Sequence, residues 1–305
     1  MLNEVTLSQM LEQARTFVAE RKFLHAAQVY SRITEASPTL EPAWVELSHV
    51  YSELRQYDAA EHVLQKAMRS SSDPNKIVFM LGNLYQKVGD YSRALTYYKQ
   101  LQLRERDLSL TIRAHLQFNM ALSYFYRGNL KLAESHFRKT KKVDPSFPKI
   151  NESLGELLIR RGAFPESVGV LRQALAADPY SWIGHYLLGL AHAKMKEWTS
   201  AYDEFVAAIE MDPNEANGWQ MCGEVLIALR RFEEAEQYLR KALELNPHLA
   251  DAIANVGFLS LHRGDLETAI DWFERALALE PNNAKALKGK RELKLAGKPR
   301  SLNSP

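Results

Sequence analysis

The chain has few of the residues and segments that would place it outside the cytosol. Cys222 is the single cysteine in 305 residues, so no disulfide can form within the chain, and its place on a predicted helix indicates a small buried residue. No run approaches the ~18 uncharged apolar residues of a membrane-spanning helix. The N-terminus lacks the basic segment and apolar run of a signal peptide. We therefore expect a cytoplasmic protein without a membrane span.

Sequence motifs of common catalytic and metal sites are also absent. The chain contains no HExxH, no cysteine pair, no GxxxxGK[ST], no GxGxxG and no GxSxG. Among its nine histidines, His185 and His192 lie one helical face apart, at positions where large side chains pack between helices, so packing is favoured over metal binding. We predict that the chain is not an enzyme and uses neither a cofactor nor a metal.

Basic charge is concentrated at the C-terminal end of a chain whose net charge is +2. From Ala284 onward there are seven lysines and arginines and one glutamate, which leaves the rest of the chain at −4. Such a segment can contact nucleic acid or an anionic membrane. No aromatic residues are interleaved with the charges, so we interpret the segment as the solvated face of a capping helix and disfavour a nucleic-acid partner.

Prolines mark a 34-residue repeat, at Pro145, Pro179, Pro213, Pro247 and Pro281. Between them, apolar residues recur at three- and four-residue steps in two runs per unit, which predicts a pair of helices that the proline ends. Small residues recur where the backbones would approach closely, at Gly155, Gly189, Gly223 and Gly257 in the first helix and at Ala133, Ala201, Ala235 and Ala269 in the second. A repeat of this length indicates stacked units.

The pattern resembles the tetratricopeptide repeat. In that family an aromatic residue, a small residue, and later Ala, Phe or Leu, Ala and Pro recur in register, as at Trp219, Gly223, Ala235, Leu239, Ala242 and Pro247. In this register eight units begin at Leu7, Glu41, Asn75, Ala114, Pro148, Trp182, Ala216 and Ala250. The resemblance implies an all-α fold, a right-handed α-solenoid of about eight repeats over residues 1–298, with a capping helix at 283–295 and a flexible tail at 299–305.

One interval departs from the repeat. From Asn75 to Ala114 is 39 residues, five more than the usual interval. The extra residues lie around 104–112 in a stretch without glycine or proline, so we expect longer helices rather than a loop, with Ser109 as a helix cap. Two interpretations stay open. The insertion is either a tolerated surface feature or a change in the angle between repeats, dividing the groove into blocks of three and five repeats.

The resemblance also implies that the first helices of the units line a concave groove. Units three to five place asparagines, lysines and aromatic residues there. Aromatic side chains provide binding area at low entropic cost, and an asparagine can bond both an amide and a carbonyl of an extended peptide. We predict that a partner contacts Lys76, Phe79, Asn83, Lys87, Phe118, Asn119, Phe125, Tyr126, Lys149 and Tyr186.

Some members of the family bind acidic chaperone C-termini with a clamp of lysine, asparagine and arginine side chains. Asn83, Asn119 and Lys149 occupy three of the five clamp positions. Phe79 replaces a lysine and Ser153 replaces an arginine, which removes two cations from the grip on a carboxylate. These departures argue against an acidic chaperone tail as the ligand.

These observations favour a protein-interaction scaffold or adaptor that binds an extended peptide or a partner helix in its groove. Two alternatives stay open. The degenerate first unit would pack into another copy and form a homo-oligomer through Leu2, Val5, Leu7, Met10 and Leu11. Alternatively, the chain is a regulatory subunit of an enzyme complex.

Overall fold

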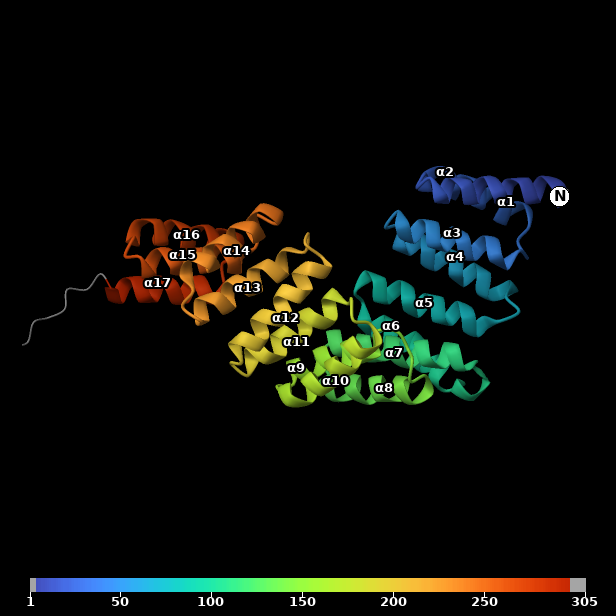
Figure 1. The fold of residues 1–305 in the computed structure, drawn as a ribbon. Coiled ribbons are helices and arrows are strands. Elements are labelled where there is room, and N and C mark those ends of the chain that lie inside the picture. Colours follow the sequence, from blue (N-terminus) through green and yellow to red (C-terminus); the bar gives the residue numbers. More distant parts are fainter. Residues whose placement is uncertain (1–3, 297–305) are drawn as a thin grey trace, which may run out of the picture. The chain divides into compact units, whose positions relative to one another are not determined.

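Helices form all the regular secondary structure that the computed structural model describes, which covers residues 4–296 (Figure 1). Within that range there are 17 α-helices and one 3₁₀ helix and no strand, which confirms the predicted all-α repeat fold. Every helix in the same range is too short or too polar to cross a bilayer. The expected tail at 299–305 lies outside the described residues, as does Leu2.

The chain divides into two compact units, with the boundary between Ile150 and Asn151. The helices of the first unit are α1 (Glu4–Ala19), α2 (Phe23–Ala36), α3 (Glu41–Glu53), α4 (Tyr57–Ser70), α5 (Pro74–Val88), α6 (Tyr91–Gln102), α7 (Leu110–Tyr126) and α8 (Leu130–Val143), with a 3₁₀ helix at Glu105–Asp107. The second unit contains α9 (Ile150–Arg160), which starts at the boundary, and α10 (Phe164–Ala177), α11 (Trp182–Lys194), α12 (Trp198–Met211), α13 (Ala216–Ala228), α14 (Phe232–Leu245), α15 (Ala250–His262), α16 (Leu266–Leu279) and α17 (Ala284–Ala296). The single solenoid over 1–298 stays a prediction.

A large buried side chain on the second helix of each pair fixes how closely the two helices approach. The Phe205 ring of α12 fills the space beside Gly189 of α11, where a Cβ atom would lie only 2.7 Å from the ring. Gly223 and Gly257 repeat this arrangement beside Leu239 and Phe273. We call the eight equivalent large residues the second-helix anchors, each at most 2% exposed: Tyr30, Leu64, Tyr98, Phe137, Leu171, Phe205, Leu239 and Phe273.

The turn inside each of the eight pairs contains a residue in the left-handed backbone conformation. In four pairs this residue has φ from +77° to +84° and is Gly89, Gly128, Gly162 or Gly264. The other four pairs place Arg21, Arg55, Lys196 or Arg230 there, with φ from 57° to 62°. A side chain at such a position costs roughly 1–2 kcal/mol, because Cβ approaches the following carbonyl oxygen. Half of the turns therefore carry backbone strain that glycine relieves in the other half.

The five-residue insertion divides between two elements. Helix α7 begins four residues ahead of Ala114, and the Oγ of Ser109 accepts a hydrogen bond of 3.3 Å from the Ile112 amide. The lengthened helix and its Ser109 cap are thus confirmed. The 3₁₀ helix at Glu105–Asp107 was not predicted. It lets the chain turn between Leu101 and Leu108, both of which are buried.

Gln117 of α7 links this insertion to the core. Its Nε2 donates to Glu105 at 2.9 Å, and its Oε1 lies 2.7 Å from Nδ1 of His136 on α8. An amide oxygen only accepts hydrogen bonds, so Nδ1 of His136 is the donor. Burial of the ring, with a smaller contribution from the charge of Lys139, lowers the pKa of His136 from 6.5 to about 4. The folded protein therefore holds this imidazole in its neutral form at pH 7.

Both ends of the described chain turn apolar side chains inward. At the C-terminal end, Ala286 and Leu293 of α17 are buried in one cluster with Phe273, as expected of a capping helix. At the N-terminal end, three residues of α1 that the sequence offered for self-assembly pack against the first core cluster; they are Leu7, Met10 and Leu11. Burial in the chain's own core leaves less of these three side chains for contact with another copy.

We predict that Arg230→Gly stabilises the protein by about 0.5–1 kcal/mol, because glycine relieves the left-handed strain at a small cost in unfolded-state entropy. Urea denaturation followed by circular dichroism measures the change. The matched control is Arg230→Ala, which removes the same side chain but keeps Cβ, and it is expected to give no gain. Equal stabilities of the glycine and alanine variants would contradict the strain.

We also predict a pH-dependent stability from His136. Between pH 6.5 and 4 the unfolded chain binds a proton on this residue that the folded chain does not, so stability falls as the pH drops through this window. The lowered pKa of His136 corresponds to a change of about 3 kcal/mol in the free energy of unfolding. His136→Asn keeps an amide that can donate to Gln117. Between pH 7 and 4.5 this variant is expected to lose about 3 kcal/mol less stability than the unmodified chain. The exposed His248→Asn is the control, and equal pH dependence in both variants would refute the role of His136.

Candidate partner-binding surface

The centre of the predicted site is a pair of asparagines on neighbouring first helices. Asn83 lies on α5 and Asn119 on α7, and the Nδ2 of Asn119 donates to the Oδ1 of Asn83 at 2.8 Å. The anchor Tyr98 of α6 adds its hydroxyl, which lies 2.7 Å from the same Oδ1 and 2.8 Å from the Oε1 of Gln86. Three helices of two successive pairs thus hold one polar cluster in place, which we call the Asn83–Asn119 site.

Local sequence determines where these helices begin and end. The carboxylate of Asp73 accepts from the amides of Asn75 and Lys76 at 3.1 and 3.4 Å and caps α5. Gly89 ends α5 in the left-handed conformation. Asp90 then caps α6 by accepting from the Arg93 amide at 3.0 Å. These caps give α5 a defined length and rotation, which places Asn83 beside α7.

A hollow of about 380 Å³ opens next to the asparagines. The rings of Tyr91 and Tyr126 stack at its edge, with centroids 5.0 Å apart and planes within 14°. Tyr126 is 53% exposed, an unusual value for so large an aromatic side chain. The residues that line the hollow are Asn83, Gln86, Lys87, Tyr91, Asn119, Leu122 and Tyr126. Four predicted residues, Asn83, Lys87, Asn119 and Tyr126, are therefore brought together there.

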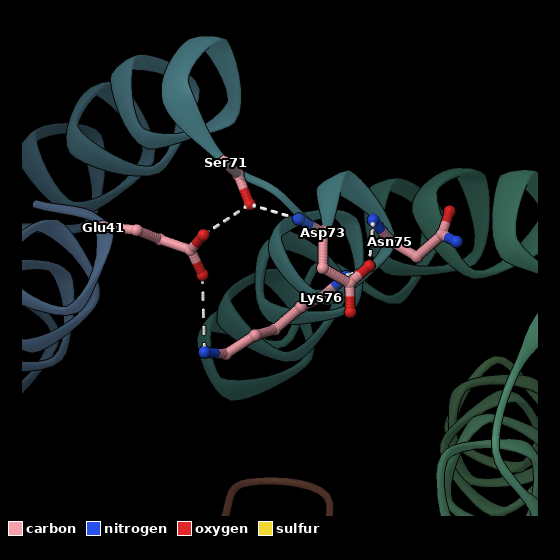
Figure 2. Close-up of polar contacts among 5 residues, drawn as sticks. All are labelled: Glu41, Ser71, Asp73, Asn75 and Lys76. Atoms are coloured by element: carbon pink, nitrogen blue, oxygen red, sulfur yellow. Dashed lines mark hydrogen bonds and ion pairs between the residues drawn. The ribbon is translucent and has the colours of Figure 1, made fainter. Parts of the chain in front are cut away.

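The two predicted lysines of α5 are paired with glutamates of the preceding repeat. Lys87 lies 2.7 Å from Glu53, and its hydrogen bond lowers the pKa of that carboxyl. Lys76 lies 3.4 Å from Glu41, which also accepts from Ser71 at 2.8 Å, as Figure 2 shows. The Ser71 bond is the main cause of the lowered pKa of Glu41. Both cations thus have an acidic partner within the first unit.

The remaining aromatic residues of the prediction differ in how much surface they offer. Phe79 is half-buried against Tyr98, with ring centroids 6.0 Å apart. Phe118 is half-buried between Phe137 and Phe147, at 5.6 and 4.8 Å. Phe125 is only 3% exposed, because it points from α7 into the core while its neighbour Tyr126 points outward. Phe125 thus contributes to the packing beneath the surface.

Lys149 and Tyr186 are not among the residues that line this hollow. Lys149 is exposed in the turn before α9 and has φ of 61°. Tyr186 belongs to the second unit, where it packs against Trp182 and Phe205 at 6.0 and 5.7 Å. Burial, followed by the charges of Glu215 and Glu224, raises the pKa of its hydroxyl. The Asn83–Asn119 site is therefore built from the first unit without these two residues.

Three residues that line the hollow were not among the predicted contacts. Gln86 and Leu122 lie on α5 and α7, one helical turn beyond Asn83 and Asn119, and this spacing alone would have identified them. Tyr91 is the first residue of the second helix α6. The prediction considered first helices only and therefore did not include Tyr91. The position of Tyr91 directly after the Gly89–Asp90 turn indicates that it lies at the edge of a helix pair.

The polar residues that suggest chemistry elsewhere have structural partners. His185 lies 2.7 Å from Glu204 and His192 lies 2.5 Å from Glu197, so each imidazole has its own carboxylate. Cys222 is completely buried, as predicted, and burial raises the pKa of its thiol to about 12. Among residues 4–296, no three His, Cys, Asp or Glu side chains converge into a group that could hold a metal ion.

Comparison with known proteins identifies distant relatives. Curated relatives include the BBSome complex member BBS4 homolog of Drosophila melanogaster, 21% identical over 235 residues that make up 77% of this chain and 47% of that protein. BBSome complex member BBS4 of Mus musculus is 22% identical over 255 residues, covering 73% of this chain and 48% of that protein. The chain spans about half the length of these curated relatives.

Solved structures show the same fold. A chain of the APC/C hetero-tetramer Cut9-Hcn1 aligns with a TM-score of 0.67 and 18% identity, covering 96% of this chain and 57% of that chain. A tetratricopeptide repeat protein from Parabacteroides merdae aligns with a TM-score of 0.66 and 16% identity, covering 83% of this chain and 98% of that chain.

Family models agree with these alignments along most of the chain. Models described as tetratricopeptide repeat match residues 41–74, 77–111, 118–181, 164–216, 186–250 and 226–293. Proteins of this kind generally mediate protein–protein interactions and are typically non-enzymatic. The chain belongs to the tetratricopeptide repeat family.

Proposed function

We propose that this chain is a non-enzymatic scaffold or adaptor that binds an extended segment of a protein partner at the Asn83–Asn119 site. The observation that carries the proposal is the bonded asparagine pair beside a hollow edged by two stacked aromatic rings, of which Tyr126 is exposed. Membership of the family supports the class of function, and relatives named as members of protein complexes point the same way.

The asparagine pair suits the backbone of a peptide. Oδ1 of Asn83 accepts from Asn119 and Tyr98, and Nδ2 of Asn119 is used as the donor. The groups left for a ligand include Nδ2 of Asn83, a donor, and Oδ1 of Asn119, an acceptor. One residue of an extended chain presents its amide hydrogen and its carbonyl oxygen toward the same side, so it matches this pair of groups at once.

The hollow favours a neutral side chain on the partner. The stacked rings of Tyr91 and Tyr126 and the side chain of Leu122 offer apolar area. Lys87 is the one cationic lining residue, and its ion pair with Glu53 offsets its charge. A free carboxylate would have to compete with Glu53 for Lys87, which argues against an acidic tail and for an uncharged residue.

We predict that Asn83→Ala combined with Asn119→Ala weakens binding of an extended peptide by more than tenfold, because both backbone bonds are lost. The probe is a 12-residue peptide selected from a random displayed library on the full chain, and fluorescence anisotropy measures its affinity. The fold should persist, since the Tyr98 hydroxyl keeps Gln86 as a partner.

The control replaces two exposed turn asparagines of the second unit, Asn214→Ala with Asn282→Ala, and should leave the affinity within twofold. Circular dichroism of both double variants checks that the helices remain. If every selected peptide binds the Asn83 and Asn119 variant as tightly as the unmodified chain, the proposed site is wrong.

A further inference from the structure

Helix α17 takes the place of the first helix of a ninth pair. It begins at Ala284, 34 residues after Ala250, and like α15 it is 13 residues long. Ala286 and Leu293 bury its inner side against the preceding pair. No helix follows α17 within residues 4–296. The side on which each earlier first helix meets its own second helix is therefore left open by the described residues.

Residues on this open side are exposed where their counterparts 34 residues earlier are covered. Leu287 is 37% exposed, whereas Ile253 of α15 is 1% exposed and shares a cluster with Phe273 of α16. Leu295 is 69% exposed, whereas Leu261 packs against that same cluster. Helix α17 thus presents two leucines on the side that a second helix covers in the preceding pair.

The second helix α16 has an uncovered edge as well, at Ile270, which is 40% exposed. In the repeat register this residue corresponds to Glu61 and Tyr202. Glu61 accepts from the hydroxyl of Tyr97, on the next second helix, at 3.5 Å. The hydroxyl of Tyr202 likewise lies 3.0 Å from that of Tyr238. Ile270 therefore occupies the position from which a second helix contacts its successor, and no successor follows it in the described part of the chain.

Two cations lie one helical turn from these leucines. Arg291 corresponds in the repeat to Gly257, and Lys294 corresponds to Ser260. Both cations are exposed, and neither forms an ion pair with another described residue. The other lysines of α17 have carboxylate partners: Lys285 with Glu224 and Asp251, Lys288 with Glu292, and Lys290 with Glu274. The unpaired positive charge of α17 thus lies beside its exposed leucines.

We propose that these residues form a second docking surface, the α17 face (Ile270, Leu287, Arg291, Lys294 and Leu295), which binds an acidic amphipathic helix of a protein partner. The partner helix lies where the second helix of a ninth pair would lie. Its apolar side covers the two leucines and Ile270, and carboxylates at its edge pair with Arg291 and Lys294. The α17 face belongs to the second compact unit and does not depend on the Asn83–Asn119 site.

Packing and charge favour this occupant over a further repeat. A Cβ atom at Gly257 would lie only 2.8 Å from the Phe273 ring. An arginine at the equivalent position therefore excludes the large buried residue that a second helix of this repeat inserts. A glutamate on a partner helix instead gives the guanidinium of Arg291 a counterion. Residues 297–305 contain Lys298 and Arg300 and no acidic residue, so they cannot supply that carboxylate.

Two other occupants fit less well. A second copy that met the α17 face with its own would bring like charges together. An anionic membrane attracts cations and leucines. However, the counterparts of Ile270 and Leu287 contact a helix in the earlier pairs, and this favours a helix here too.

The test is a selection on the full chain from a displayed library of 18-residue helices. Every member has the same leucine side, and the flanking positions vary among glutamate, glutamine, alanine and lysine. Glutamate should be enriched at the flanks. Fluorescence anisotropy measures the affinity of the selected peptide, and circular dichroism measures its helix content in the complex. Arg291→Glu with Lys294→Glu should weaken this peptide at least tenfold and, in a new selection, should enrich lysine instead.

The apolar contact is tested by Leu287→Ala with Leu295→Ala, which should weaken the selected peptide at least fivefold. The fold should persist, because both leucines are exposed and alanine is a strong helix former. Matched controls make the same changes at exposed residues of the first unit: Lys131→Glu with Lys142→Glu, and Leu24→Ala with Leu103→Ala. These controls, and Asn83→Ala with Asn119→Ala, should leave the affinity within twofold.

Three results would overturn the proposal, and none of them affects the Asn83–Asn119 site. The first is a selected helix that binds the charge and leucine variants of the α17 face as tightly as the unmodified chain. The second is a selection that does not enrich glutamate; binding of phosphatidylserine vesicles that the charge reversal abolishes would then assign the face to a membrane. The third is a dimer, seen by light scattering, that Leu287→Ala with Leu295→Ala dissociates, which would assign the face to a second copy.

Discussion

The close approach of the two helices in each pair is the contact on which the rest of the structure depends. Each second helix inserts one large buried residue toward the first helix, and in several pairs the facing residue is glycine because a Cβ atom would overlap the ring or branch. Burying such a side chain contributes roughly 1.5–3 kcal/mol. Neighbouring pairs then stack on a unit whose internal geometry is already determined, so stability accumulates pair by pair.

The same packing position also brings polar chemistry to the surface. Phenylalanine or leucine at this position offers no polar group, whereas the hydroxyl of Tyr98 reaches Asn83 and Gln86 of the first helix. Tyr98 thereby orders Asn83 and, through it, Asn119. A residue whose ring is needed for stability thus also orients amides that solvent can reach. Binding and folding share one side chain, which ties the geometry of the surface to the geometry of the pair.

The repeat made most of the fold predictable, because helix period, small residues and prolines recur in register. The repeat register also predicted that Asn83 and Asn119 lie on the same surface. It did not reveal that Lys76 and Lys87 pair with Glu41 and Glu53, since these contacts cross from one repeat to the next and depend on side-chain reach rather than on the period of a helix. Nor did it separate Phe125 from Tyr126, two adjacent aromatics on one helix of which the first is buried and the second is exposed.

Side chains in neighbouring repeats meet at nearly constant intervals along the sequence: Glu53 with Lys87 after 34 residues, Tyr202 with Tyr238 after 36. An interface is thus defined by two adjacent pairs alone. Loss or duplication of 34 residues would bring matching surfaces together at the new junction, so the length of such a chain can evolve in whole modules. The Glu105–Gln117–His136 connection belongs to the one interval of a different length. These hydrogen bonds distinguish this interval from the others, because they depend on the five-residue insertion that the other repeats lack.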